Sequence, residues 1–442
     1  PLSECLRNIK YIYLYFIIFV EILYMYSLLK SAIILDKKSE FHNKKVDILV
    51  QNGIISDISE NIKNPKNLKE INLPNLHISP GWFDYSVCTG EPGYEERGNI
   101  SNTLYVASRS GFTSIGLQPN TFPVTEKNTE IEFLKSASKN SSVSIHPIGA
   151  LTKKSELFEL AELFEMKNSG AIGFGDYKQP IGNPNLLKLA LLYTRDINTP
   201  IFSFPLNDEI SNNGVMNESK SSTMLGLKGI PNIAEEIQIM RDIKILEYTG
   251  GNLHIPYIST SNSVKLIREA KKKGLNISCS TCIHNLFFDD SSLNNFDTKY
   301  KVLPPLRTQS DIDELIAAVK DGTIDIVTSD HNPLNLELKN LEFDNADFGT
   351  IGLESLFGAL NKIFPLKTVI NILTRGKKIF NIEDTSIKIG AQADLTLFNP
   401  LTNYVFDEKD ILSISKNSIF KNTSLKGIVY GIISNGKISL NE

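Results

Sequence analysis

The sequence contains few cysteines and shows no marked excess of charge. Its four cysteines, Cys5, Cys88, Cys279 and Cys282, are too few for a disulfide framework in 442 residues, so a reducing compartment, the cytoplasm, is expected. The net charge of −4 gives no reason to expect a nucleic-acid partner. We find no internal repeat, and the one biased segment is a polar loop predicted at 207–222.

Long apolar runs are also scarce, and the only one covers residues 11–29. Its length could almost span a bilayer, but Glu21 lies in its middle and no small-residue cleavage site follows. Two interpretations stay open for residues 1–25. In the first, these residues are an apolar N-terminal extension that arises from translation upstream of Met25. In the second, they belong to a membrane segment. No membrane association is expected unless the second interpretation holds.

Both ends of the remaining chain have the pattern of short β-strands. Near the beginning, strands are predicted at 28–35, 46–51 and 54–58, and Asn52-Gly53 between the last two is a strong hairpin signal. Near the end, strands are predicted at 393–398 and 428–433, followed by a turn at 434–437. We therefore expect a small discontinuous β-sandwich domain built from residues 26–77 and 385–442.

Strands and helices alternate between these ends. Strands are predicted at 78–83, 113–117, 143–148, 171–174, 201–204, 252–258, 276–280 and 324–329. The clearest helices are predicted at 232–249, 261–273 and 311–321, with Gly274 and Gly322 ending the last two. Eight such units favour an α/β protein with a (β/α)8 TIM-type barrel over residues 78–384. In such a barrel, function resides in the loops after the strands, where Asp84, Asn120, Asp176, Tyr257, His284 and Asp330 fall.

Several short segments occur in a specific order and spacing along this framework. They are EPGYE at 91–95, GFTS at 111–114, QPNT at 118–121, GIP at 229–231, IST at 258–260, YKVLPPLR at 300–307, KDGTID at 320–325, TSDHNP at 328–333 and FGTIGLE at 348–354. Together they resemble dihydroorotase of the amidohydrolase superfamily, in the type that assembles with aspartate transcarbamoylase. The resemblance covers roughly residues 26–440. It implies a zinc-activated water that acts on a cyclic amide, with an aspartate that carries its proton.

The resemblance also shows which metal ligands this sequence lacks. The family's first strand carries Asp-x-His-x-His, and the corresponding residues here are Asp84, Ser86 and Cys88. A third histidine falls on Phe204, or on Ser203 if the register slips, and a fourth on Tyr257. Two carboxylates are retained: Asp330 aligns with the proton-carrying aspartate and Asp176 with a ligand. Two carboxylates without imidazoles are a poor zinc pair, so no zinc is expected.

Substrate contacts are lost as well. The family's arginine, asparagine and histidine contacts fall on Gly90, Leu303 and Leu334. Asn120 survives as a substrate-binding remnant, and Arg307 is a second candidate remnant.

Other polar residues have alternative interpretations. Cys279, Cys282 and His284 could form a rebuilt metal site with Cys88, although buried small cysteines are the favoured interpretation. Strand alternation places Cys282 and His284 on one face and Cys279 on the other. Asp330 and His331 could form an acid–base pair, or they could be inherited framework. Asp176 is also a candidate turn cap, and His254 a candidate core residue; His42, His77 and His146 are expected at the surface or at loop ends.

The sequence thus predicts a catalytically impaired dihydroorotase homologue. Its expected role is structural, as a homodimer that supports aspartate transcarbamoylase. The alternative is an active amidohydrolase with an altered site, perhaps one metal on Asp176, Asp330 and Cys88. A third possibility is a small-molecule sensor that uses the vestigial pocket.

Overall fold

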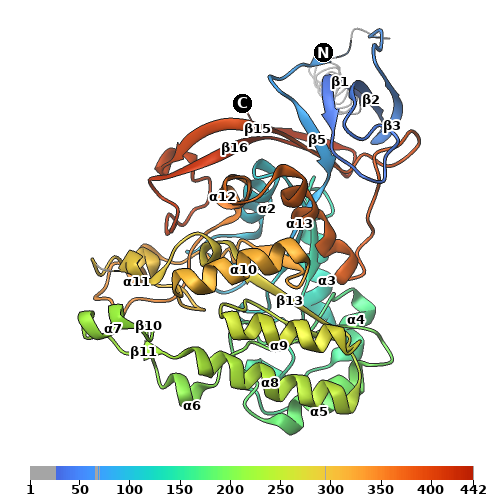
Figure 1. The fold of residues 1–442 in the computed structure, drawn as a ribbon. Coiled ribbons are helices and arrows are strands. Elements are labelled where there is room, and N and C mark those ends of the chain that lie inside the picture. The colour runs from blue at the N-terminus through green and yellow to red at the C-terminus, as the bar shows by residue number, and fades with distance from the viewer. Residues whose placement is uncertain (1–25, 65–67, 69, 294, 442) are drawn as a thin grey trace, which may run out of the picture.

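A computed structural model describes residues 26–64, 68, 70–293 and 295–441, and Figure 1 shows how their helices and strands are arranged. Within these residues, eight parallel segments form the predicted barrel. Seven of them are the strands β6 (Trp82–Val87), β7 (Phe112–Leu117), β8 (Ser144–Pro147), β9 (Ile201–Phe202), β12 (Leu253–Ile255), β13 (Ile277–Cys282) and β14 (Ile326–Thr328). The eighth is the segment around Phe174, which bridges Gly149 after β8 and Ile201 in β9. A bridge between Val87 and His331 joins the first strand to the loop after the last. The predicted fold class is confirmed.

Helices surround the barrel strands. They are α2 (Ile100–Arg109), α3 (Asn128–Ala137), α4 (Leu163–Ser169), α5 (Pro184–Thr194), α8 (Asn232–Thr249), α9 (Ser261–Lys272), α10 (Gln309–Asp321), α12 (Leu353–Ile363) and α13 (Leu366–Ile379). The predicted helices agree with α8, α9 and α10 to within two residues. Gly274 and Gly322 adopt positive φ of 78° and 85° directly after α9 and α10, as expected for helix ends.

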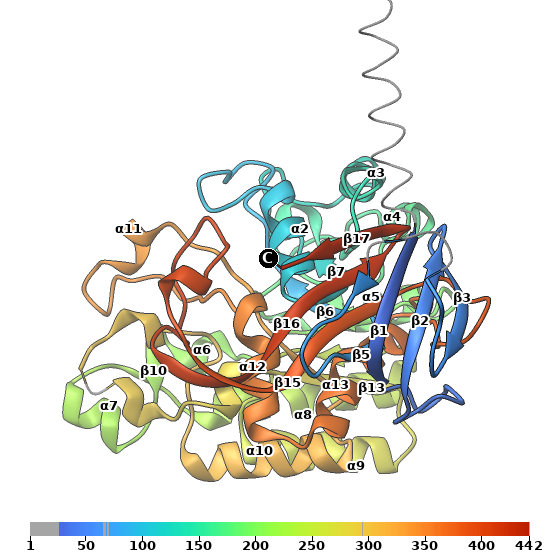
Figure 2. The ribbon, with the colours of Figure 1, turned by 90° about the horizontal axis from the view of Figure 1, so that it is seen from above.

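Both ends of the chain contribute to a single eight-stranded sheet. Its order is β17-β16-β15-β5-β1-β2-β3, with β4 paired to β1. The strands are β1 (Tyr26–Ile34), β2 (Lys45–Gln51), β3 (Ile54–Ser59), β4 (Glu70–Ile71), β5 (His77–Pro80), β15 (Leu395–Phe406), β16 (Thr423–Ser434) and β17 (Lys437–Leu440). Figure 2 shows the N-terminal strands β1–β3 beside the C-terminal strands β15–β17. Both predicted turns are present, because Asn52-Gly53 and Asn435-Gly436 have positive φ and join antiparallel strands.

The predicted first barrel strand at 78–83 is wrong in its bounds. Residues up to Pro80 form β5, which pairs with β1 and β15 of the terminal sheet, and the barrel begins with β6 at Trp82. Gly81 separates the two. A side chain there would lie 2.0 Å from the Thr113 hydroxyl and 2.2 Å from Asp394, so only glycine lets the chain pass from one sheet to the other.

The segment predicted as a polar loop at 207–222 is partly ordered. It contains α6 (Asp208–Ser211), β10 (Met216–Asn217) and the start of α7 (Lys220–Leu225), and β10 pairs with β11 (Gly229–Ile230). The polar side chains are helix caps: Asn207 accepts a hydrogen bond from the Ile210 amide, and Ser219 caps α7. The remaining short elements are α11 (Leu336–Lys339) and the 3-10 helices η1 (Lys153–Ser155), η2 (Ile283–Leu286), η3 (Asp290–Leu293), η4 (Thr298–Tyr300) and η5 (Glu408–Asp410).

The expectation for residues 1–25 lies outside the described part of the chain. The last residues of the apolar run, from Tyr26 onward, belong to β1. Within the described ranges, none of the helices is both long enough and apolar enough to cross a membrane.

Candidate functional site at the barrel mouth

Asp84 connects the first and last strands of the barrel. Its carboxylate accepts hydrogen bonds from the Thr328 hydroxyl, from the Ser86 amide at 3.1 Å and from the Ser329 amide at 2.9 Å. Burial raises the pKa of Asp84, and these hydrogen bonds oppose the shift. All these partners belong to the barrel, so Asp84 serves the framework.

Ser86 and Tyr257, which occupy two positions where the resemblance implies histidines, are hydrogen-bonded to each other. The Ser86 and Tyr257 hydroxyls lie 2.6 Å apart, and both residues are buried. The ring of Phe204, at a third histidine position, lies 6.2 Å from the Tyr257 ring. Below them the barrel interior is filled by Phe83, Tyr85, Phe202 and Phe380. Aromatic packing therefore continues from the interior up to the mouth.

Cys88, at the fourth of these positions, is a buried thiol. Burial raises its pKa to about 12, and the side chains of Tyr177 and Asn120 lie within hydrogen-bonding reach. Asn120 lines a cavity of about 270 Å³ together with Tyr177 and Lys178. The predicted remnant Asn120 thus does lie at the mouth.

Asp330 is fully buried and paired with a lysine. Lys178 Nζ lies 2.6 Å from one carboxylate oxygen, and the Tyr177 hydroxyl donates to the other at 3.2 Å. Burial raises the pKa of Asp330, while the Lys178 ammonium opposes that rise. Sequence reasoning did not single out Lys178; the available signal was its place two residues after Asp176, at the end of the fourth barrel segment.

The Asp176 carboxylate is bonded to the loop after β8. It accepts hydrogen bonds from the Leu151 amide at 3.0 Å, and from the Thr152 amide and hydroxyl at 3.2 and 2.7 Å. The expectation that Asp176 shares a ligand set with Asp330 and Cys88 is therefore wrong. Its interpretation as a loop cap is confirmed, and the next residue, Tyr177, reaches Asp330 instead.

The backbone at three strand ends adopts the left-handed region. The φ angles of Tyr177, Tyr257 and Asp330 are 47°, 56° and 50°, which is uncommon for side chains other than glycine and asparagine. Such conformations cost about 1–3 kcal/mol each and persist where the surrounding structure holds them. The side chains at the mouth are thus held in place by the rigid strands below them.

Among the described residues, one group of three side chains could hold a metal ion. Ligand atoms of Cys282, His284 and Asp330 lie within 4.8 Å of one another, and all three residues are buried. Both ring nitrogens of His284 lack a hydrogen-bond partner in the described part of the chain. The predicted alternation is confirmed, because Cys279 faces outward and donates to the Thr323 carbonyl at 3.4 Å. Our interpretation of Cys282 as only a buried small cysteine is therefore incomplete.

The family's zinc pair does not fit these residues. Positions 86, 88, 204 and 257 carry no imidazole, and hydroxyl groups or aromatic rings fill the space there. The remaining group offers one thiol, one imidazole and one carboxylate, which is at most a set for a single ion.

Arg307 is not a substrate contact. Its guanidinium is buried and donates to the Asn217 side chain at 2.9 Å, the Ile230 carbonyl at 2.7 Å and the Ser259 hydroxyl at 3.0 Å. Glu235 lies 3.7 Å away as its counterion. Arg307 thus fastens β10, β11 and the loop after β12, and the prediction of a substrate-binding remnant is wrong.

At the lost arginine position, Gly90 forms the base of a tight loop. Its amide donates to the Gly98 carbonyl at 3.0 Å, and its carbonyl accepts from the Tyr94 amide at 2.6 Å. A Cβ atom at Gly90 would lie 2.0 Å from the Tyr94 carbonyl oxygen. The loop as built therefore accepts no side chain at this position.

The other histidines serve the framework. His331 accepts weak hydrogen bonds from the Gly352 and Leu353 amides at 3.3 and 3.4 Å, which supports its interpretation as a loop cap. His254 lies among interior aromatic rings, bonded to Ser278 and Ser280, and burial lowers its pKa to about 3. His42, His77 and His146 are partly exposed.

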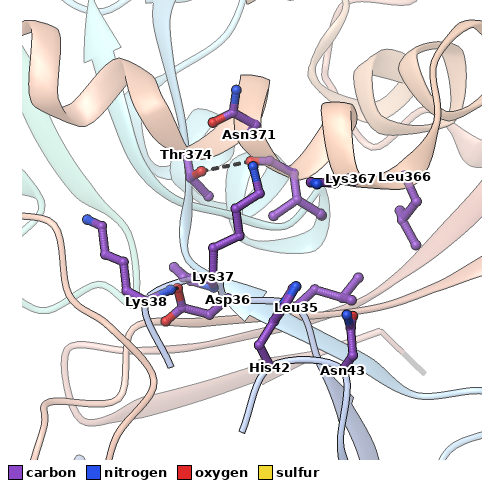
Figure 3. A pocket seen from close by; sticks show the side chains of 12 residues that line it. Leu35, Asp36, Lys37, Lys38, His42, Asn43, Leu366, Lys367, Asn371 and Thr374 are labelled. Atoms are coloured by element: carbon purple, nitrogen blue, oxygen red, sulfur yellow. Dashed lines mark hydrogen bonds between the residues drawn. The ribbon is translucent and has the colours of Figure 1, made fainter. Parts of the chain in front are cut away.

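A second cavity lies away from the mouth, between the terminal sheet and α13. Figure 3 shows its lining, which includes Lys37, Lys38, His42 and Lys367, around a volume of about 440 Å³. The carboxylate of Asp36 is already bonded to the Ser386 hydroxyl and the Ile387 amide, both at 2.8 Å. This cavity offers positive charge but no acid–base or nucleophilic pair.

Comparison with known proteins gives a consistent assignment. Residues 76–263 match the family model described as dihydro-orotase-like. The chain is 34% identical over 422 residues to a dihydroorotase of Pelotomaculum thermopropionicum, covering 94% of this chain and 98% of that protein. It is 36% identical over 400 residues to a dihydroorotase of a Thermoanaerobacter species, covering 89% and 92%.

Solved structures with the same fold are more distant in sequence. An L-hydantoinase (dihydropyrimidinase) from Arthrobacter aurescens has a TM-score of 0.81 at 20% identity, over 93% of this chain and 95% of that chain. A D-hydantoinase from a Thermus species has a TM-score of 0.78 at 18% identity, over 94% and 95%. These structures establish the architecture of a barrel with a β-sandwich domain.

Proposed function

Because this chain belongs to the dihydroorotase family, we propose that it is a protein of pyrimidine biosynthesis that keeps the family fold without its hydrolytic chemistry. One observation carries the proposal: the aspartate that aligns with the proton carrier is paired with Lys178 at 2.6 Å, inside a mouth that lacks the imidazoles of a zinc pair. An ammonium bound to Asp330 stabilises the carboxylate and competes with any water that would give it a proton. We derive no hydrolytic step for this site.

The test is an assay of dihydroorotate hydrolysis and of carbamoyl aspartate cyclisation, combined with metal analysis of the purified chain. We expect no turnover and no stoichiometric zinc. The Asp330→Asn variant is the matched control, because any background rate should be the same in both proteins. Turnover that Asp330→Asn abolishes, together with bound metal, would refute the proposal.

The alternative is an amidohydrolase with one metal ion, and the cluster of Cys282, His284 and Asp330 is the observation that favours it. This set differs from the set expected from the sequence, because the group found among the described residues includes neither Asp176 nor Cys88. The same assay distinguishes the two functions, because the alternative requires turnover that depends on Cys282.

We assign a structural role to the chain, as a cytoplasmic partner that supports aspartate transcarbamoylase. A supporting observation is an apolar surface on the packed helices α5 and α8, which we call the α5/α8 face. Its exposed apolar residues are Leu189, Leu192, Tyr193, Ile233, Ile237, Met240 and Tyr248. On α8, Ile233, Ile237 and Met240 are spaced by four and three residues, and Tyr248 follows about two helical turns later, so the four lie along one stripe. A contiguous exposed apolar surface is typical of protein interaction sites.

Co-purification with aspartate transcarbamoylase from the same organism tests this role. Ile237→Asp should weaken the complex, whereas Leu401→Asp, at an exposed apolar position in β15 of the terminal sheet, should leave it intact. If the wild-type chain forms no complex at micromolar concentration, the partner is wrong. If Ile237→Asp instead converts a dimer into a monomer, the face belongs to the expected homodimer.

A further inference from the structure

The arrangement around His284 contains an unexplained polar group. The imidazole is fully buried, and neither ring nitrogen has a hydrogen-bond partner among the described residues. Buried polar groups are nearly always paired, so such an orphan calls for a reason. The ligand atoms of Cys282 and Asp330 lie within 4.8 Å of it and of each other. Thiol, imidazole and carboxylate together are the donor set of a transition-metal site.

The local positive charge is supplied by Lys178. Its ammonium contacts Asp330 at 2.6 Å, and only 10% of the lysine side chain is exposed. Burial lowers the pKa of His284 well below its ordinary value, and Lys178 lowers it further. Burial raises the pKa of Cys282, with Asp330 adding to the shift and Lys178 opposing it. The charge of one ammonium therefore acts on all three potential ligands.

We propose that the Lys178 ammonium is a resident cation in a latent transition-metal site made by Cys282, His284 and Asp330. The site accepts a borderline divalent ion such as Zn²⁺ or Co²⁺ once the ammonium is removed. The inference rests on the proposed function and deepens it, since it gives a physical reason for the expectation that the wild-type chain binds no metal at Asp330.

The charge balance supports this exchange. With Lys178 in place, the ammonium and the Asp330 carboxylate sum to zero, while Cys282 and His284 stay neutral. A divalent ion would bind Asp330, neutral His284 and the Cys282 thiolate, and the thiol proton would leave to solvent. That arrangement also sums to zero. A divalent ion added while the ammonium remains would leave an extra buried positive charge, which is strongly unfavourable.

The required movement is small. Tetrahedral zinc bonds of about 2.0–2.3 Å place neighbouring ligand atoms about 3.3–3.8 Å apart. Ligand atoms that now lie within 4.8 Å of one another would therefore approach by about 1 Å. Lys178, which contacts Asp330, also lines the cavity beside Asn120 and Tyr177.

Co²⁺ titration of the full chain tests the inference. Lys178→Ala removes the ammonium and opens space, so it should bind one Co²⁺ with a thiolate-to-cobalt charge-transfer band and an increase in Tm. Lys178→Met removes the charge but fills the space, so this matched control should bind none. The double variants Lys178→Ala/Cys282→Ser and Lys178→Ala/His284→Ala should lose the band and bind at least about 100-fold more weakly. The wild-type chain should also bind at least about 100-fold more weakly than Lys178→Ala.

Several outcomes would overturn the inference. They are a folded Lys178→Ala variant that binds no Co²⁺, a band that persists without Cys282, and wild-type binding as tight as that of Lys178→Ala. If Lys178→Ala is insoluble, expression with added Zn²⁺ decides: recovery of soluble protein supports the site, and continued insolubility contradicts it. Dihydroorotate turnover by the wild-type chain would refute the proposed function alone, because these titrations measure no activity.

Discussion

Replacing Lys178 by methionine should destabilise the protein in a manner that depends on pH. The substitution keeps the side-chain volume and removes the ammonium that lies 2.6 Å from the fully buried Asp330. Asp330 then keeps the Tyr177 hydroxyl, at 3.2 Å, and the Ser86 side chain as partners that stabilise its charge. A buried carboxylate in this position lowers its energy by binding a proton.

The free energy needed to protonate Asp330 is the upper limit of the stability loss in Lys178→Met. Protonating a carboxyl with an ordinary pKa of about 3.9 costs about 1.4 kcal/mol per pH unit, which is about 4 kcal/mol at pH 7 and about 1.5 kcal/mol at pH 5. The value at pH 7 agrees with the roughly 3–5 kcal/mol lost when one partner of a buried ion pair is removed. In the variant, the folded pKa of Asp330 lies above its unfolded value, so stability decreases as pH rises from 5 to 7.

Urea denaturation at both pH values measures the difference between wild type and Lys178→Met. We expect a loss of about 2–4 kcal/mol at pH 7 and a smaller loss at pH 5. Lys178→Met/Asp330→Asn, which removes both charges, should recover most of the stability at pH 7. An equal loss at both pH values, or no recovery in the double variant, would show that the ammonium does not hold the carboxylate.

Three further predictions concern the barrel. Tyr257→Phe removes the hydroxyl that lies 2.6 Å from the buried Ser86 hydroxyl, so the free energy of unfolding should fall by about 1–2 kcal/mol. Adding Ser86→Ala should recover part of this loss. If the losses of the two single variants add fully in the double variant, the hydrogen bond between Ser86 and Tyr257 is contradicted. Arg307→Met should destabilise the chain by about 3–5 kcal/mol in chemical denaturation, because Glu235 loses its counterion. Unchanged stability would contradict the structural role of Arg307 and reopen its interpretation as a substrate contact. Burial lowers the pKa of His254 to about 3, so this residue is neutral in the folded chain. Its contribution to the free energy of unfolding is therefore complete above pH 6.5. As the pH falls toward 3, that contribution decreases by about 1.4 kcal/mol per pH unit. His254→Asn should flatten this dependence in denaturation curves, and an unaltered pH profile would show that another group is responsible.

Local signals were sufficient for much of the fold. The helix α8, the glycine ends of α9 and α10, and the Asn-Gly turns depend on residues close in sequence, so their pattern predicts them. The boundary between β5 and β6 depends on how tightly Gly81 passes Thr113 and Asp394, which are distant in sequence. No periodicity in the strand encodes that contact.

The absence of imidazole ligands at the candidate site could be predicted from the sequence, but the contacts among the residues that are present could not. Residue identity alone shows that Ser86, Phe204 and Tyr257 cannot act as imidazole ligands. It does not show that Tyr177 bonds to Asp330 while Asp176 bonds to the loop after β8, because a change of one residue after a strand reverses the direction of the side chain. Lys178 was not identified, and Arg307 was misjudged, for a related reason: a single long cation has no pattern in sequence, and only tertiary contacts reveal its partner.

The loop that begins at Gly90 limits which residues position 90 can carry. Its carbonyl and amide close a turn so tight that a methyl group would strike the Tyr94 oxygen at 2.0 Å. Gly90→Arg would therefore force the turn to open, since every other side chain begins with a Cβ atom. An arginine at position 90 could extend from this loop only if the backbone between Gly90 and Gly98 took another path.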